Sequence, residues 1–267
     1  MEELSFRLQS GETVSCEIRR SPRARKLRLA FSPLGVLTLG APAAITLASI
    51  KKEVQLFLPW IEKNWPQFRE RRFPDLPQAI HFPARGQIWA VSHVENLDES
   101  RMASQTAALG RLFHRGARRM ALLEQAGALT LFGPAAERQL AFDALAWWCR
   151  AKARQFLPPF LLALAEKSAL PLPRVLIGDQ RSLWGSCSVS ASGQPVIRLN
   201  WRSLLLERDL LAHLCWHELC HIEAPNHSAQ FHLLLESRSP GSSTLERALG
   251  RAWSALPGWV HAPRRRD

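Results

Sequence analysis

The sequence of 267 residues contains no tyrosine, so no phenol hydroxyl can serve in any site. It has no run of about eighteen apolar residues, which a membrane-spanning helix requires. Its start, Met-Glu-Glu-Leu-Ser-Phe-Arg, is acidic and polar, whereas a secretory signal needs a basic and then an apolar segment. The cysteines number five and lack the paired spacing of a disulfide framework. We therefore expect a globular cytoplasmic protein with no membrane partner.

Lysine is also scarce, and arginine supplies most of the 35 basic residues behind the net charge of +12. The segment Arg19–Arg28 places six basic side chains within ten residues and contains no acid. Such a cluster can hold phosphates, so nucleic acid is one expected partner. A solvated strand face is the equally good alternative interpretation.

The most informative stretch is residues 217–227, His-Glu-Leu-Cys-His-Ile-Glu-Ala-Pro-Asn-His. On a helix, His217 and His221 leave the same face one turn apart, which is the spacing of two ligands on one zinc ion. Glu218 beside them is placed as the general base of a metallohydrolase. After the Pro-Asn break, His227 can turn back as a third ligand and leave the fourth tetrahedral position open. The stretch therefore predicts a catalytic Zn²⁺ site, because burying these side chains without a metal would be costly.

Other residues could supply the third ligand instead of His227. Glu236 and Glu246 could do so from a later helix, and Cys187 from an upstream segment, whereas Glu223 would point away from the metal face. His227 is preferred because the 1-5-11 histidine pattern recurs where a helix ends and the chain turns back. The metzincins share that pattern, but they require a glycine where Ala224 stands and a methionine downstream, and every methionine here is upstream. The metzincins are therefore excluded.

Amide hydrolysis also needs a group that stabilises the negative oxygen of the tetrahedral intermediate. His213, one turn before His217, and His232 are the candidates by position. A packing or supporting role is the alternative for both.

The apolar pattern predicts both strands and helices. Strands are expected at 4–9, 13–20, 26–32, 35–40, 87–94, 128–132, 175–177, 182–188 and 195–200, the last two as a hairpin around 190–193. Helices are expected at 46–72, 101–125, 136–168 (where Pro158 and Pro159 could kink it), 204–223, from 227 onward and at 243–255. Either strand of the hairpin could bind an extended peptide by adding it to a sheet edge.

Several short runs together resemble the YgjP-like metallopeptidase family, which is related to the SprT and WLM (Spartan-type) proteases. They are Trp184-Gly185-Ser186-Cys187-Ser188, Leu199-Asn200-Trp201, His217–His221, Asn226-His227-Ser228 and Phe231. Residues 18–37 also resemble that family's β-rich start, so the resemblance covers roughly residues 16–235.

The resemblance implies an α+β fold, with a zincin-like core (a mixed sheet with an active-site helix) preceded by a β-rich N-terminal part. We expect the N-terminal part at 1–75, a variable middle segment at 76–135 and the zincin-like core at 136–260. The resemblance also implies His217, His221 and His227 as metal ligands and Glu218 as the catalytic residue.

Three positions depart from the family's usual pattern. His213 replaces a tyrosine, His232 replaces a tryptophan and Leu183 replaces a basic residue. The Trp-Gly-Ser-Cys run has a purely structural alternative, in which Trp184 and Cys187 pack under the active-site helix and Gly185 permits close backbone approach.

The leading prediction of function is a zinc metallopeptidase that acts on a peptide or protein. The first alternative is a metal-dependent endoribonuclease with YbeY-like histidine spacing, but such nucleases lack the glutamate at position 218. The second alternative is a non-catalytic zinc protein that associates with nucleic acid through Arg19–Arg28. A purely structural zinc site would usually be closed by four protein ligands.

Overall fold

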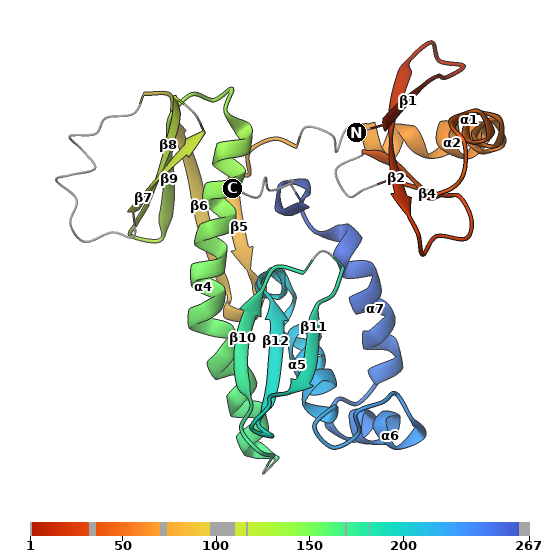
Figure 1. The fold of residues 1–267 in the computed structure, drawn as a ribbon. Coiled ribbons are helices and arrows are strands. Elements are labelled where there is room, and N and C mark those ends of the chain that lie inside the picture. The colour runs from red at the N-terminus through yellow and green to blue at the C-terminus, as the bar shows by residue number, and fades with distance from the viewer. Residues whose placement is uncertain are drawn as a thin grey trace. The chain divides into compact units, whose positions relative to one another are not determined.

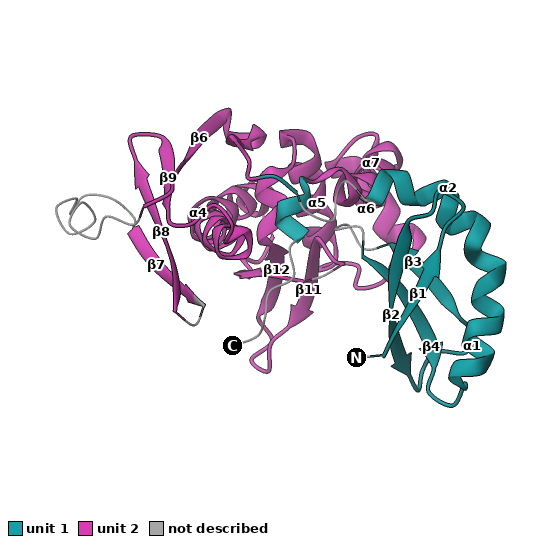
Figure 2. Ribbon diagram, turned by 90° about the horizontal axis from the view of Figure 1, so that it is seen from above, with its two compact units in different colours: residues 1–75, 257–267 teal, residues 76–256 magenta. Residues whose placement is uncertain are grey.

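The computed structural model describes residues 2–31, 36–69, 74–96, 110–115, 117–168, 170–180 and 182–261. Contacts divide the chain into two compact units, Met1–Asp75 together with Pro257–Asp267, and Leu76–Leu256. Figures 1 and 2 show the elements of each unit. The predicted limits of a separate middle segment at 76–135 and a core at 136–260 stay predictions. Among the described residues, no helix is both long and apolar enough to cross a membrane.

The first unit contains a four-stranded sheet in the order β1-β2-β4-β3. Its strands are β1 (Glu2–Arg7), β2 (Thr13–Ser21), β3 (Arg28–Phe31) and β4 (Leu37–Pro42). Its helices are α1 (Leu47–Val54), the 3-10 helix η1 (Gln55–Phe57), α2 (Leu58–Arg69) and the separate 3-10 helix η5 (Gly258–His261). The four predicted strands are confirmed. The helix predicted over 46–72 forms as three consecutive helical segments from Leu47 to Arg69, and residues 70–72 lie outside the described part.

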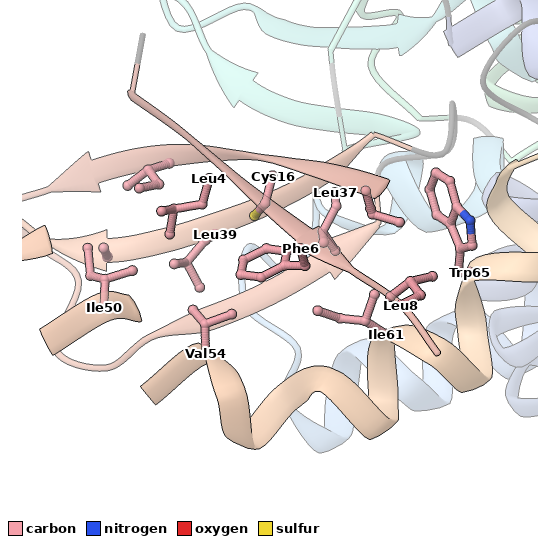
Figure 3. Close-up of a cluster of buried hydrophobic side chains, with 13 residues drawn as sticks. Leu4, Phe6, Leu8, Cys16, Leu37, Leu39, Ile50, Val54, Ile61 and Trp65 are labelled. Carbon is pink, nitrogen blue, oxygen red and sulfur yellow. The ribbon is translucent and has the colours of Figure 1, made fainter. Parts of the chain in front are cut away.

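The core of this unit lies between one face of the sheet and the two α-helices, as Figure 3 shows. Alternate residues of the strands, such as Leu4 and Phe6 in β1, point into it, because successive side chains of a strand face opposite sides. Ile50, Val54 and Ile61 meet them from the helices, at helical spacing. The opposite alternation leaves the other face of the sheet polar.

The second unit begins with a five-stranded sheet in the order β5-β6-β9-β8-β7. Its strands are β5 (Ala79–Phe82), β6 (Gln87–Val94), β7 (Gly110–Arg115), β8 (Arg118–Gln125) and β9 (Ala128–Phe132). A 3-10 helix, η3 (Pro83–Arg85), joins β5 to β6. The strands predicted near 87–94 and 128–132 are confirmed.

The helix predicted over 101–125 is wrong for residues 110–115 and 118–125, which pair as β7 and β8. Residues 101–109 and 116 lie outside the described part. The cause is that Met120–Leu123 are four consecutive buried residues, a pattern that fits a strand covered on both faces as well as a helix. Ala121 and Leu123 pack with Phe132 in one cluster, so sheet packing decides against the local helix propensity.

The remaining described part of this unit combines a three-stranded sheet with four α-helices and one 3-10 helix. The strands are β10 (Arg174–Gly178), β11 (Gly185–Val189) and β12 (Pro195–Asn200), in the order β10-β12-β11. The helices are α4 (Arg138–Lys167), the 3-10 helix η4 (Trp201–Leu205), α5 (Arg208–Cys220), α6 (Ala229–Arg238) and α7 (Ser242–Ala255). The chain is therefore a mixed α+β protein, as expected.

Two features of this part position the site. β10 runs parallel to β12, whereas β11 runs antiparallel to it and forms one edge of the sheet, which confirms the predicted hairpin. The long helix α4 continues through Pro158 and Pro159 and contacts β8 on one side and β10 and α5 on the other (Figure 1). α5, which carries the histidine motif, also contacts β11 and α7.

Candidate metal centre

Three imidazoles converge at the end of α5. His217 lies in the last turn of that helix, His221 is its C-cap, and His227 lies just before α6. One nitrogen from each ring lies within 4.8 Å of the others, and Nε2 of His217 is 3.3 Å from Nε2 of His227. Two nitrogens bound at about 2.0–2.1 Å to one tetrahedral zinc ion are about 3.3 Å apart. The spacing therefore fits a zinc ion without rearrangement of these two rings.

A short turn brings His227 back to α5. The backbone N–H of Ala224 donates to the carbonyl of Cys220, which closes the last turn of the helix, and Pro225 follows. Ser228 then caps α6 by accepting a hydrogen bond from the N–H of Phe231. The helix stop and the next helix start are therefore only a few residues apart, which holds His227 against the face of α5.

Phe231 lies beneath the three imidazoles. Its buried ring has centroid distances of 5.1 Å to His217, 4.6 Å to His221 and 4.7 Å to His227. Because Phe231 also packs against Cys220 and Leu235, it anchors the histidines to the apolar cluster between α5 and α6.

Hydrogen bonds fix which nitrogen two of the rings present. Nδ1–H of His217 donates to Oε1 of Glu246 at 2.6 Å, and Nδ1–H of His221 donates to the carbonyl of Ala224 at 3.2 Å. Both rings therefore hold Nε2 free of a proton on the side where a metal would bind. Burial disfavours the charged form of His217, but the hydrogen bond to Glu246 and the charges of Glu218 and Glu246 outweigh it and raise the pKa of His217.

Glu218 is almost entirely buried, with 4% of its surface exposed, and its carboxylate lies against the backbone of Gly185 in β11. A Cβ at position 185 would lie only 2.8 Å from Cδ of Glu218, so this approach requires glycine. Burial raises the pKa of Glu218 to about 7, although the charge of His217 opposes the shift. A cation bound to the histidines would favour the ionised carboxylate, which is the form that accepts a proton.

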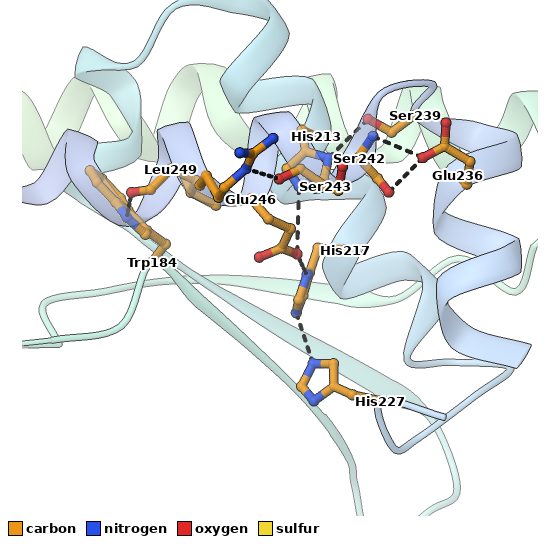
Figure 4. Close-up of polar contacts among 11 residues, drawn as sticks. Trp184, His213, His217, His227, Glu236, Ser239, Ser242, Ser243, Glu246 and Leu249 are labelled. Atoms are coloured by element: carbon orange, nitrogen blue, oxygen red, sulfur yellow. Dashed lines mark hydrogen bonds and ion pairs between the residues drawn. The ribbon is translucent and has the colours of Figure 1, made fainter. Parts of the chain in front are cut away.

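Glu246 belongs to a polar network that connects α5, α6 and α7, drawn in Figure 4. Oε1 of Glu246 also lies 3.6 Å from Nε2 of His213, and Nδ1 of His213 is hydrogen-bonded to Oγ of Ser239 at 2.9 Å. Glu236 accepts hydrogen bonds from the backbone N–H groups of Gly241 and Ser242 at the start of α7. The network fixes the position of α7, and with it the carboxylate that holds His217.

The expectation that His213 could stabilise a tetrahedral intermediate is wrong. His213 is 0% exposed and lies on the far side of Glu246 from His227, as Figure 4 shows. His232 remains a candidate, because it is exposed and its ring centroid is 6.5 Å from that of His227. The alternative third ligands are not in the cluster either: Glu236 and Glu246 are engaged as described, and no ligand atom of Cys187 belongs to the group of three histidines.

The runs around Trp184 and Asn200 shape the strand opposite the histidines. Nε1–H of Trp184 donates to the carbonyl of Leu249 in α7 at 3.1 Å, and the indole packs edge-on against Trp253. Asn200 is fully buried, and its Nδ2 donates to the carbonyls of Gln180 and Leu183 at 2.8 and 2.9 Å. These bonds hold the segment that leads into β11. The hydrogen bond and the ring contact of Trp184 are with α7 and not with the helix that carries the histidines, so the structural interpretation of this run is confirmed only for the close approach at Gly185.

Two pockets adjoin the metal centre and share His217 and His227. The strand-side pocket, of about 700 Å³, is also lined by Glu218, His221 and residues 185–189 of β11. The helix-side pocket, of about 1010 Å³, is also lined by His232, Leu233 and Glu246 from α6 and α7. Although the net charge of the chain is +12, no described lysine or arginine lines either pocket.

The basic segment Arg19–Arg28 lies in the other unit, over β2, the following turn and the start of β3. Arg19 forms an ion pair with Glu17 at 3.0 Å, and Arg20 forms one with Glu2 at 2.8 Å, so part of its charge is compensated. Binding of nucleic acid to this segment stays a prediction.

A helix with two histidines and a glutamate, completed by a histidine from the next turn, is the arrangement of the metal-dependent peptidases with an H-E-x-x-H motif. Comparison with protein families bears this out: the profile of the YgjP-like metallopeptidase domain matches residues 25–252. The chain therefore belongs to the YgjP-like metallopeptidase family. No curated protein and no solved structure gives a significant match.

Removing the carboxylate of Glu246 is expected to weaken zinc binding without unfolding the protein. Glu246→Gln should lower zinc affinity by about 10-fold and Glu246→Ala by up to about 100-fold, because an outer-shell partner orients the ligand and raises its basicity. Competition with a chromogenic zinc chelator measures the affinity. Arg251→Gln, an exposed change on the same helix, is the control. Equal zinc affinity for the wild type and both Glu246 variants would remove Glu246 from this role.

Proposed function

We propose that the chain is a zinc-dependent metallopeptidase with a zincin-like core, in which His217, His221 and His227 hold the ion and Glu218 is the general base. The observation that supports this most strongly is the convergence of three imidazoles, two of them with Nε2 turned to a common point by hydrogen bonds at Nδ1, beside one buried carboxylate. When bound, the ion acts as a Lewis acid, which polarises a peptide carbonyl and lowers the pKa of a water molecule.

The role of Glu218 follows from its position. Glu218 lines the strand-side pocket together with His217 and His221, so its carboxylate is next to the proposed metal ligands. As general base it takes a proton from the attacking water, and as general acid it returns that proton to the leaving amine. Neither step requires the carboxylate to bind the metal.

The edge strand β11 supports a peptide as substrate. In the described part of the sheet it pairs only with β12, so its other edge is available to an extended chain. The segment before it is fixed by Asn200, and its first residue, Gly185, touches Glu218. A peptide that pairs with this edge would pass directly in front of the catalytic carboxylate.

The pockets disfavour the nuclease alternative. Binding of an RNA backbone uses lysine and arginine side chains beside the metal, whereas the charged groups among the described lining residues are carboxylates, notably Glu218 and Glu246. We expect the zinc-loaded protein to cleave a chemically unfolded protein and to leave a single-stranded RNA intact under the same conditions. Gel analysis of both substrates, with and without a chelator, measures this. Chelator-sensitive cleavage of RNA with no proteolysis would favour the ribonuclease.

A further inference from the structure

The two pockets beside the metal centre carry exposed apolar side chains. In the Leu76–Leu256 unit, six large apolar side chains are exposed among the described residues: Ile88, Val94, Leu172, Leu183, Val189 and Leu233. Three of these line the pockets: Leu183 and Val189 line the strand-side pocket, and Leu233 lines the helix-side pocket. They are 54%, 71% and 73% exposed, so nothing in the described structure covers them. Exposed apolar side chains that line the pockets beside one site can contact the apolar groups of a bound ligand.

Their positions match an extended chain that crosses the site. Leu183 precedes β11 and Val189 ends it, so the two lie at opposite ends of the edge strand. Leu233 lies in α6, in the pocket on the other side of His217 and His227. A strand added to β11 would therefore meet an apolar side chain near each end of β11, and in the pocket on the other side of His217 and His227 it would meet Leu233.

The carboxylates of the two pockets disfavour acidic side chains in a bound peptide. The strand-side pocket holds Glu218, and the helix-side pocket holds Glu236 and Glu246. Glu236 accepts hydrogen bonds from the backbone N–H groups of Gly241 and Ser242, and Glu246 accepts one from Nδ1–H of His217, so both side chains are held in place as hydrogen-bond acceptors. Because no described lysine or arginine lines either pocket, no side chain there offsets the repulsion, and an acidic residue placed away from the metal ion would meet like charge.

We infer that the site recognises an extended polypeptide segment with apolar side chains on both sides of the scissile bond and no acidic residue there. This inference rests on the proposed peptidase function and narrows its substrate. Such segments are buried in folded proteins, so the substrate class is unfolded or misfolded polypeptide chains rather than folded proteins or acidic peptides.

Binding to the zinc-loaded Glu218→Gln variant separates recognition from cleavage. A fluorescent peptide with leucine at the two positions that flank one peptide bond is compared with the same peptide carrying serine or aspartate there. The variant lacks the charge of Glu218 but keeps those of Glu236 and Glu246, so we expect binding to be about 10-fold weaker with serine and weakened by more than that with aspartate, measured by fluorescence anisotropy. Equal affinity for the leucine and aspartate peptides would overturn the inference.

Variants of the pocket walls test the same point from the protein side. Val189→Ser and Leu233→Ser should each weaken binding of the leucine peptide about 5- to 10-fold and leave the serine peptide unchanged. Ile88→Ser is the matched control, because Ile88 is 65% exposed but lies on β6 and lines neither pocket. Val189→Lys should improve binding of the aspartate peptide. An equal loss with Ile88→Ser, or no loss with either pocket variant, would contradict the inference.

The outcomes also separate this inference from the proposed function. If the variant prefers the leucine peptide but the zinc-loaded wild type cleaves no peptide, the peptidase proposal fails and the recognition stands. If the wild type cleaves all three peptides equally well, the peptidase proposal stands and the recognition fails. A further outcome is that the wild type self-associates in sedimentation, and that Val189→Ser and Leu233→Ser abolish this association without changing peptide binding. The apolar side chains would then contact a second copy of the chain, and the inference would be overturned.

Discussion

Replacement of Glu218 by glutamine is expected to reduce kcat for peptide cleavage by about 1000-fold, within the range that general acid–base catalysis contributes. Glutamine keeps the size of the side chain and its fit against Gly185, so the fold and the histidines should be unchanged. It cannot accept the proton of the attacking water, and it has none to give to the leaving amine. Steady-state cleavage of a quenched fluorescent peptide measures the effect, and metal analysis should still find one zinc ion per chain.

The matched control for this variant lies immediately before the same helix. Glu207 precedes α5, is exposed and makes no side-chain capping bond, so Glu207→Gln removes the same charge without touching the pockets. It should retain full activity. Wild-type activity in a zinc-loaded Glu218→Gln protein would rule out Glu218 as the general base.

Replacement of His227 by alanine is expected to lower zinc affinity by well over the ~100-fold that loss of an outer-shell partner costs, because a first-shell nitrogen is removed. After dialysis the variant should contain less than one tenth of an ion per chain and show no cleavage. Its thermal stability should approach that of the metal-free wild type, since a ligand that binds only the folded state stabilises it. Metal analysis and a thermal melt with and without zinc test both points.

His81→Ala is the control for the loss of a histidine. His81 is exposed on β5 and is not among the three clustered histidines. It should keep its zinc and its activity. A His227→Ala protein that retains one tightly bound zinc ion would show that another residue completes the site, and Cys187 and His232, which also line the two pockets, would be the next to test.

The residues proposed to bind the metal could be predicted from the sequence because they are local. His217, Glu218 and His221 lie within one helical turn, and His227 follows after a turn that Pro225 and Asn226 signal. Glu246 could only be suggested as an alternative ligand, since its contact with His217 depends on how α7 packs against α5. No spacing rule covers two helices whose relative position is set by Glu236, Ser239 and His213.

The fold shows the same division between local and non-local information. The hairpin of β11 and β12 follows from its turn residues and α6 from its cap residue Ser228, and the residue pattern within each segment predicts α5 and α7. The hairpin of β7 and β8 does not, because Met120–Leu123 become a strand only when α4 packs against β8 and when Ala121 and Leu123 pack beside Phe132 of the neighbouring strand β9. In the same way, the position of Gly185 against Glu218 is a contact between two elements, and the glycine alone does not reveal it.

The central proposal is that one zinc ion held by three histidines makes this chain a peptidase. The most direct measurement is a titration of zinc into the metal-free protein while cleavage of a quenched apolar peptide is followed. Activity is predicted to rise in proportion to added zinc and to reach its plateau at one ion per chain, with no rise in Glu218→Gln. Absence of cleavage at every ratio, or cleavage that is independent of zinc, would contradict the proposal.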